Sequence, residues 1–240
     1  MNQITFNLIA ISIFTVTMSS LLGPLVHLSP LIPAAAVVTL MGLVTVDRFA
    51  WQGTGGTLLV DWFARRSPAH CDRVIHHEAG HFLVAYLLNI PITGYALSAW
   101  EAFRQGQAGQ GGVTFDCQEL EAELQQGTLS AQLLERYCTV WMAGGVAETL
   151  VYGNAEGGAD DLQKFRTIWG QLRRPNREGQ EKERGAVLKA RNLLQQHQEA
   201  YQALVEALKQ EMNVTECYQI IEQHRQDVPA IAMDASSNPL

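Results

Sequence analysis

The chain has 240 residues, of which 17% are charged, and a formal net charge of −7 at pH 7. An acidic chain of this kind lacks the basic surface on which nucleic-acid binding depends, so we expect no nucleic-acid partner. Its four cysteines show no C-x-x-C spacing, which argues against a disulfide framework and favours reduced thiols.

Apolar runs dominate the N-terminal part of the chain. No Asp, Glu, Lys or Arg occurs before Asp47. Residues 4–26 and 31–46 are two apolar runs with prolines between them, and a helix of roughly 17–25 residues crosses a bilayer. We therefore expect a transmembrane helical hairpin that serves as a membrane anchor over residues 1–48. A secretory signal peptide is the alternative, which is disfavoured because no Lys or Arg precedes the first run.

The charges after the expected hairpin indicate its orientation. Arg48, Arg65 and Arg66 favour an integral membrane protein whose remaining part faces the cytoplasm, or the equivalent organelle interior. Residues 49–66 contain several glycines and are interpreted as a linker. We expect one domain over residues 67–226, followed by a disordered tail over residues 227–240.

A helix over residues 68–88 is predicted by its flanks. Ser67 is a good N-cap, Pro68 suits the first helical position, and Asn89 is a stop signal. The middle of this helix carries the sequence HEAGH at positions 77–81.

The HEAGH sequence predicts two metal ligands and a general base beside them. His77 and His81 are one helical turn apart, so both imidazole rings project from one face and can bind one Zn²⁺. Glu78, next to the first histidine, is the candidate general base that takes a proton from the attacking water. An accidental match on an ordinary helix is the alternative. A catalytic zinc site also needs a third protein ligand.

The surrounding periodicity predicts a mostly helical domain with a small β-hairpin. The expected strands cover residues 92–99 and 112–115, on either side of a glycine-rich loop. The expected helices cover residues 120–126, 130–152, 184–210 and 215–224.

Two later motifs offer acids for the third ligand. The sequence AGGVAE at positions 143–148 is a run of small residues that would let one helix approach another closely, and it ends in Glu148. The sequence GGADDL at positions 157–162 is a glycine turn that places Asp160 and Asp161 at the start of a helix.

These three motifs together resemble the peptidase domain of the FtsH family of membrane-anchored zinc proteases, over residues 64–224. The resemblance implies a zincin-like, mostly helical fold, with His77 and His81 as zinc ligands, Glu78 as the base and Asp161 as the third ligand. Asp160 is the second choice, because the spacing of the glycines can be matched in two ways. Glu148 is interpreted either as a buried carboxylate that holds a ligand or a helix in place, or as a salt-bridged helix residue.

The sequence lacks the G-x-x-x-x-G-K-[S/T] loop of the ATPase module that FtsH proteases carry, so we expect no ATP hydrolysis by this chain. The favoured function is a membrane-anchored zinc metalloendopeptidase acting on unfolded or membrane-associated proteins. A noncatalytic FtsH-like assembly protein and an intramembrane metalloprotease are the alternatives. Expected partners are protein or peptide substrates, the membrane, and further copies of this chain or a separate FtsH-type ATPase.

Overall fold

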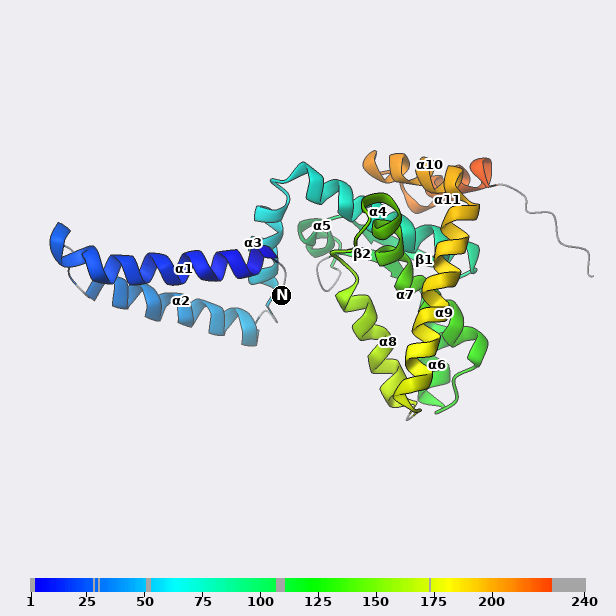
Figure 1. Cartoon of the computed structure of the whole chain (residues 1–240), viewed down its shortest axis with the longest axis horizontal. Coiled ribbons are helices and arrows are strands. Elements are labelled where there is room, and N and C mark those ends of the chain that lie inside the picture. Colours follow the sequence, from blue (N-terminus) through cyan, green and yellow to red (C-terminus); the bar gives the residue numbers. More distant parts are fainter. Residues whose placement is uncertain are drawn as a thin grey trace, which may run out of the picture. The chain divides into compact units, whose positions relative to one another are not determined.

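The computed structural model describes residues 3–27, 29, 31–50, 53–106, 111–172 and 174–225. This part is mainly helical, with a small two-stranded antiparallel sheet (Figure 1). It forms two compact units, of which the first comprises Met1–Glu78 and Thr93–Thr114, and the second comprises Ala79–Ile92 and Phe115–Leu240. The mostly helical character expected from the sequence is therefore confirmed, and so is the pairing of two short strands.

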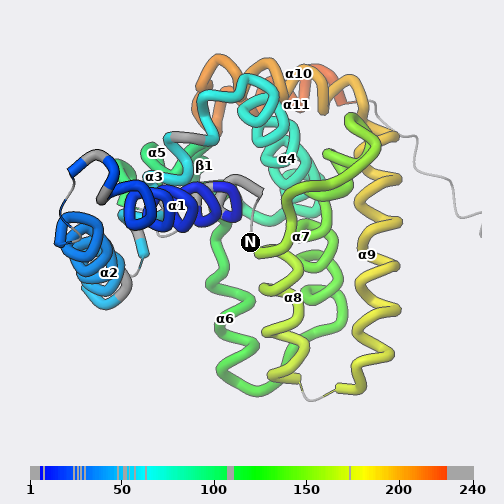
Figure 2. Tube along the Cα trace, turned by 60° about the vertical axis from the view of Figure 1, so that its left-hand side comes forward, coloured from blue at the N-terminus to red at the C-terminus, as the bar shows by residue number. Residues whose placement is uncertain are grey.

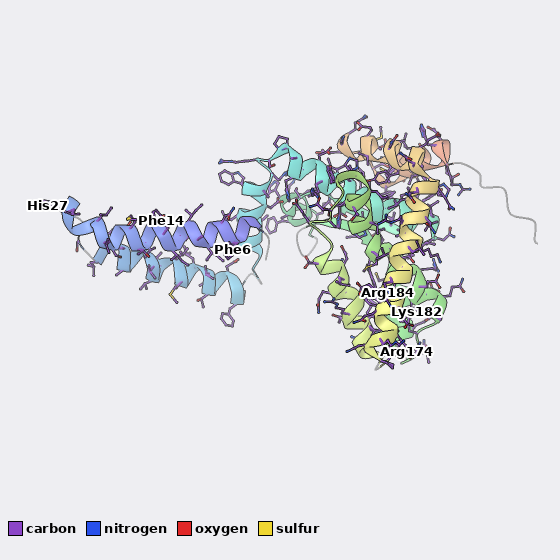
Figure 3. The ribbon with its side chains drawn as sticks, in the orientation of Figure 1. Phe6, Phe14, His27, Arg174, Lys182 and Arg184 are labelled. Carbon is purple, nitrogen blue, oxygen red and sulfur yellow. The ribbon has the colours of Figure 1, made fainter. Side chains whose placement is uncertain are left out.

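The first unit begins with two apolar helices, α1 (Gln3–Leu22) and α2 (Leu31–Ala50), which pack against each other. Large apolar side chains remain exposed on both helices. Phe6 and Phe14, labelled on α1 in Figure 3, are 63% and 62% exposed.

In the part of the chain that the structure describes, no helix is both long enough and apolar enough to cross a membrane. The predicted transmembrane hairpin is therefore wrong. The first apolar run does not continue as one α-helix, because α1 ends at Leu22 and a 3-10 helix, η1 (Gly23–Val26), follows it. Polar residues such as Asn7 in α1 and Thr45 in α2 also lower the hydropathy of the two helices.

The range interpreted as a linker contains a helix, α3 (Thr54–Ala64). Asp47 holds its first turn, because its Oδ1 accepts a hydrogen bond from the Gly55 N–H at 2.8 Å and its Oδ2 accepts one from the Gly56 N–H at 3.0 Å. The carboxylate thus satisfies N–H groups that have no partner within the helix and lies at the positive end of the helix dipole. A Cβ on Gly55 would lie 2.8 Å from Asp47 Oδ1, so the glycine permits this close approach.

The metal-motif helix is α4 (Pro68–Leu87), almost as predicted. The His70 N–H donates to Ser67 Oγ at 3.4 Å, which supports the N-cap role expected for Ser67. Asn89, with φ of 54°, adopts the left-handed conformation that commonly ends a helix.

The sheet pairs β1 (Ile92–Ala96) with β2 (Gly112–Phe115). The second strand agrees with the prediction, and the first ends before residue 99. It is shorter because Ser98 starts another helix, α5 (Ala99–Arg104), where Ser98 Oγ accepts a hydrogen bond from the Glu101 N–H at 3.0 Å. This helix was not predicted from the sequence.

The second unit is built around α7 (Ala131–Tyr152), which packs against α8 (Ala159–Gln171) and α9 (Asn176–Gln196). Figure 2 shows these three helices running alongside one another. A short helix, α6 (Gln118–Gln125), precedes α7. Burial of apolar side chains, at about 25 cal/mol per Å², drives this packing. The buried residues of α7 include Leu134, Tyr137, Val140, Trp141 and Ala147.

The long helix expected over residues 184–210 is two helices, so that prediction is wrong. They are α9 and α10 (Gln198–Lys209), and they meet at His197, whose φ of −113° and ψ of 39° are not helical. The last helix, α11 (Val214–His224), packs on α10 and starts with a capping box between Asn213 and Glu216. The expected tail over residues 227–240 lies outside the described residues.

Candidate metal centre

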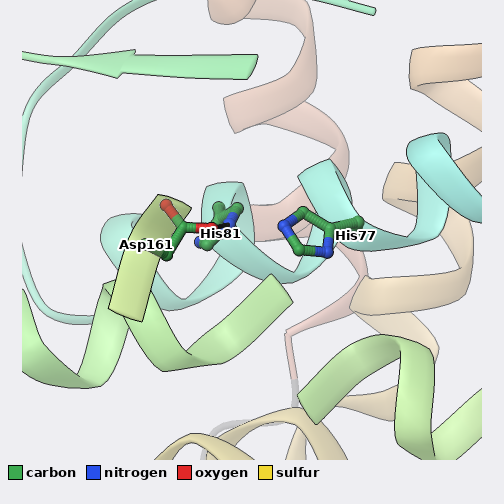
Figure 4. A group of neighbouring side chains, drawn as sticks. All are labelled: His77, His81 and Asp161. Carbon is green, nitrogen blue, oxygen red and sulfur yellow. Dashed lines mark hydrogen bonds and ion pairs between the residues drawn. The ribbon is translucent and has the colours of Figure 1, made fainter. Parts of the chain in front are cut away.

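The structure brings His77, His81 and Asp161 together as a buried group that could hold a metal ion. One ligand atom from each residue lies within 4.8 Å of the others, and the side chains come from α4 and α8 (Figure 4). The three residues are 8%, 5% and 8% exposed. Two imidazoles and one carboxylate are a ligand set that zinc accepts in catalytic sites.

The spacing on α4 explains the first two ligands. His77 and His81 are four residues apart, which is about one turn, so both face the same way from one continuous helix. The helix is therefore a rigid support for two of the three ligands.

A glycine in the motif allows α4 to approach α7 closely. A Cβ on Gly80 would lie 2.7 Å from the carbonyl oxygen of Ala143 and 2.7 Å from Cβ of Ala147. Real Cβ atoms essentially never come so close to other atoms, so no larger residue fits at position 80 without a shift. The close helix approach expected from the small residues at positions 143–148 is thus confirmed.

A backbone carbonyl of α7 fixes the tautomer of His81. Its Nδ1 lies 2.7 Å from the carbonyl oxygen of Val140. Because a carbonyl oxygen only accepts hydrogen bonds, Nδ1 must carry the proton and donate it. In a neutral ring the lone pair is then on Nε2, which is the atom that a metal ion would bind.

The second contact of His81 places two electron-pair donors face to face. Its Nε2 lies 3.2 Å from Oδ2 of Asp161. A lone pair on Nε2 and a carboxylate oxygen repel each other unless a cation stands between or beside them, so the pair needs either an extra proton or a metal ion. Two atoms bound tetrahedrally at about 2.0–2.2 Å from zinc are roughly 3.3–3.6 Å apart, and the observed distance is close to the lower end of this range.

Asp161 is brought to the histidines by a loop that Glu148 holds. Glu148, 1% exposed on α7, accepts hydrogen bonds from the backbone N–H groups of Glu156 at 2.8 Å and Gly157 at 3.0 Å. Gly158 then adopts a φ of 87° immediately before α8 begins. Of the two interpretations of Glu148, these hydrogen bonds support the carboxylate that holds an element in place, because both of its oxygens accept backbone N–H groups of the loop.

The two aspartates at the start of α8 differ in their surroundings. Asp161 is buried in the metal group, whereas the Asp160 side chain is exposed and is not in that group. The other oxygen of Asp161, Oδ1, accepts a hydrogen bond from Lys164 Nζ at 2.9 Å. Lys164 was not among the residues predicted from the sequence, although a lysine three residues after an aspartate on a helix is a recognisable pairing signal.

Glu78 is oriented by the β-sheet of the first unit. Its Oε2 accepts a hydrogen bond from the backbone N–H of Val113 at 2.9 Å, and a Cβ on Gly112 would lie 3.3 Å from the same oxygen. Gly112 has a φ of 115°, a conformation that favours glycine. The sequence predicted the strand but gave no signal for this contact, since it involves only a backbone N–H.

No protein-family model matches this chain. The resemblance to the FtsH peptidase domain therefore stays a prediction that rests on the three motifs. The metal group itself rests on the positions of His77, His81 and Asp161.

Proposed function

We propose that this chain is a zinc metalloendopeptidase of the HExxH type that hydrolyses peptide bonds in unfolded proteins. The buried group of His77, His81 and Asp161, with Glu78 next to the first ligand on α4, is the observation that carries the proposal. Zinc is the favoured ion because two imidazoles and one carboxylate leave a coordination position open for water or substrate.

Two of the three proposed ligands are positioned by other residues of the chain. Val140 fixes the tautomer of His81, and the Glu148-bound loop presents Asp161. When bound there, zinc supplies a Lewis acid that polarises the peptide carbonyl and makes water more acidic.

Glu78 performs the proton transfers. Its carboxylate accepts a proton from the attacking water as the new C–O bond forms, and it passes this proton to the peptide nitrogen as the C–N bond breaks. The products are a carboxylate and an amine. The Val113 N–H supports this role because it holds the orientation of one carboxylate oxygen, which a general base needs.

The test compares hydrolysis of casein, a loosely folded protein, by the zinc-loaded chain and by its Glu78→Gln variant. We expect the substitution to lower the rate by about 10²–10⁴-fold while zinc remains bound, because a general base typically contributes that much. Glu119→Gln, an exposed glutamate on α6, is the matched control and should leave the rate unchanged. Equal rates for the native chain and Glu78→Gln, or no hydrolysis by the native chain with zinc bound, would refute the peptidase proposal.

We also propose that folded substrates reach this site through a separate ATPase of the FtsH type. Residues 1–240 contain no G-x-x-x-x-G-K-[S/T] loop, the motif that holds the phosphates of ATP in ATPases that unfold proteins. Hydrolysis of a stably folded protein should therefore require the added ATPase and ATP, whereas casein hydrolysis should not. Equal hydrolysis of both substrates by the chain alone would contradict this partnership.

A further inference from the structure

The two carboxylate oxygens of Asp161 make different contacts. Oδ2 lies 3.2 Å from Nε2 of His81, on the side of the metal group. Oδ1 accepts a hydrogen bond from Nζ of Lys164 at 2.9 Å. Lys164 is three residues further along α8, so the pair is formed within one helix and does not depend on a loop.

The number of oxygens that Asp161 gives to the metal affects the chemistry of the site. A carboxylate can bind a cation through one oxygen or through both. A catalytic zinc site combines three protein donor atoms with one position for water or substrate. If Asp161 used both oxygens, a fourth protein atom would compete for that position and donate more electron density to the metal.

A charged donor on Oδ1 prevents that second mode of binding. The ammonium group of Lys164 makes a charge-assisted hydrogen bond, and such bonds are shorter and stronger than those between neutral groups. Rotation of Asp161 to bring Oδ1 to the metal would break this bond. It would also bring the ammonium charge closer to a second cation, which is unfavourable.

We propose that Lys164 is a positioning residue that keeps Asp161 a one-oxygen ligand and so keeps one coordination position open. This inference rests on the proposed zinc site. The side chain of Lys164 is 57% exposed, so its substitution removes little packing and the variants should fold.

The experiment replaces zinc with Co²⁺, whose visible absorption is intense in four-coordinate sites and weak when the coordination number rises. We expect the Lys164→Met variant to bind Co²⁺ with clearly weaker visible bands than the native chain, because both oxygens of Asp161 then bind. Lys164→Arg keeps a cationic donor and should retain the native spectrum. Casein hydrolysis by the zinc forms should follow the same order, with kcat reduced in Lys164→Met and rescued in Lys164→Arg.

Lys209→Met is the matched control. Lys209 Nζ lies 3.0 Å from Oε1 of Glu206, an ion pair with the same order and spacing that is not part of the metal group. This variant should retain the native spectrum. A native spectrum in Lys164→Met, or equal weakening in Lys209→Met, would overturn the role of Lys164 and leave the zinc site standing. Failure of the native chain to bind Co²⁺ or Zn²⁺ would overturn the zinc site, and the role of Lys164 with it.

Discussion

Glu148 and Gly157 are joined by a hydrogen bond of 3.0 Å between the buried carboxylate of the first and the backbone N–H of the second. The other oxygen of the same carboxylate accepts the N–H of Glu156. One side chain on α7 thereby fixes the loop that precedes α8 and the metal-group residue Asp161. A buried carboxylate far from the metal motif in sequence is thus tied to the geometry of the third ligand.

Substitution of Glu148 by Gln should weaken both stability and metal binding. The amide group of Gln cannot accept hydrogen bonds at both of its ends, so one loop N–H loses its partner. We expect the free energy of unfolding to fall by about 1–3 kcal/mol, and zinc affinity to fall by roughly 10–100-fold. Chemical denaturation and competition with a zinc chelator measure the two effects.

Glu135→Gln is the control for this prediction. Glu135 is also on α7, but its Oε1 pairs with Lys189 Nζ at the surface, and such pairs contribute no more than about 1 kcal/mol. It should leave zinc affinity unchanged. Equal losses of zinc affinity in the two variants would show that Glu148 does not act through the loop.

Gly80 should tolerate no side chain. The Cβ of Gly80→Ala would lie 2.7 Å from atoms of Ala143 and Ala147, and overpacking of this kind costs about 1–3 kcal/mol of folding free energy. Gly185→Ala on α9, where nothing lies within 4 Å of the added Cβ, should instead stabilise the chain by about 0.5–1 kcal/mol, because Ala is the better helix former. Urea denaturation distinguishes these opposite signs, and stabilisation by Gly80→Ala would contradict the close helix approach.

His197 should make stability depend on pH. It is 8% exposed, and its Nδ1 has no hydrogen-bond partner within the described part of the chain. Burial, assisted by the nearby charge of Arg225, lowers the pKa of His197 below its usual value of 6.5. Because the folded state then resists protonation more than the unfolded state does, stability is complete above pH 6.5 and falls as pH decreases from 6.5 toward the lowered pKa.

The measurement is the free energy of unfolding at pH 7.5 and pH 5.5 for the native chain and for His197→Gln. The variant should lose less stability between these two pH values than the native chain. His224→Gln, at an exposed position on α11, should keep the native dependence. An unchanged pH dependence in His197→Gln would show that this side chain is not the source.

The local features of α4 could be predicted from the sequence because they depend on neighbouring residues. Ser67, Pro68 and Asn89 set the ends of the helix, and the four-residue spacing of His77 and His81 places both rings on one face. The third ligand could not be derived in this way. Asp161 is 80 residues from His81, and its approach depends on the packing of α7 and α8 and on the loop that Glu148 holds.

Other features could not be predicted from the sequence, because hydrophobic periodicity carries no information about them. Apolar residues continue at helical spacing from α9 into α10, so nothing in that pattern showed the break at His197. The contact of Glu78 with the Val113 N–H involves no side chain on β2. The predicted transmembrane hairpin rests on the length of two uncharged runs, but polar residues within the helices and the end of α1 at Leu22 limit their apolar length.

The most direct test of the metal site is the zinc content of the purified native chain and of two neighbouring substitutions, Asp161→Asn and Asp160→Asn, measured by native mass spectrometry. We predict one zinc ion per chain in the native protein and in Asp160→Asn, because Asp160 is exposed and outside the metal group. Asp161→Asn should lose most of its zinc, since it removes a charged ligand. Full zinc content in Asp161→Asn, or loss of zinc in Asp160→Asn alone, would contradict a metal centre formed by His77, His81 and Asp161.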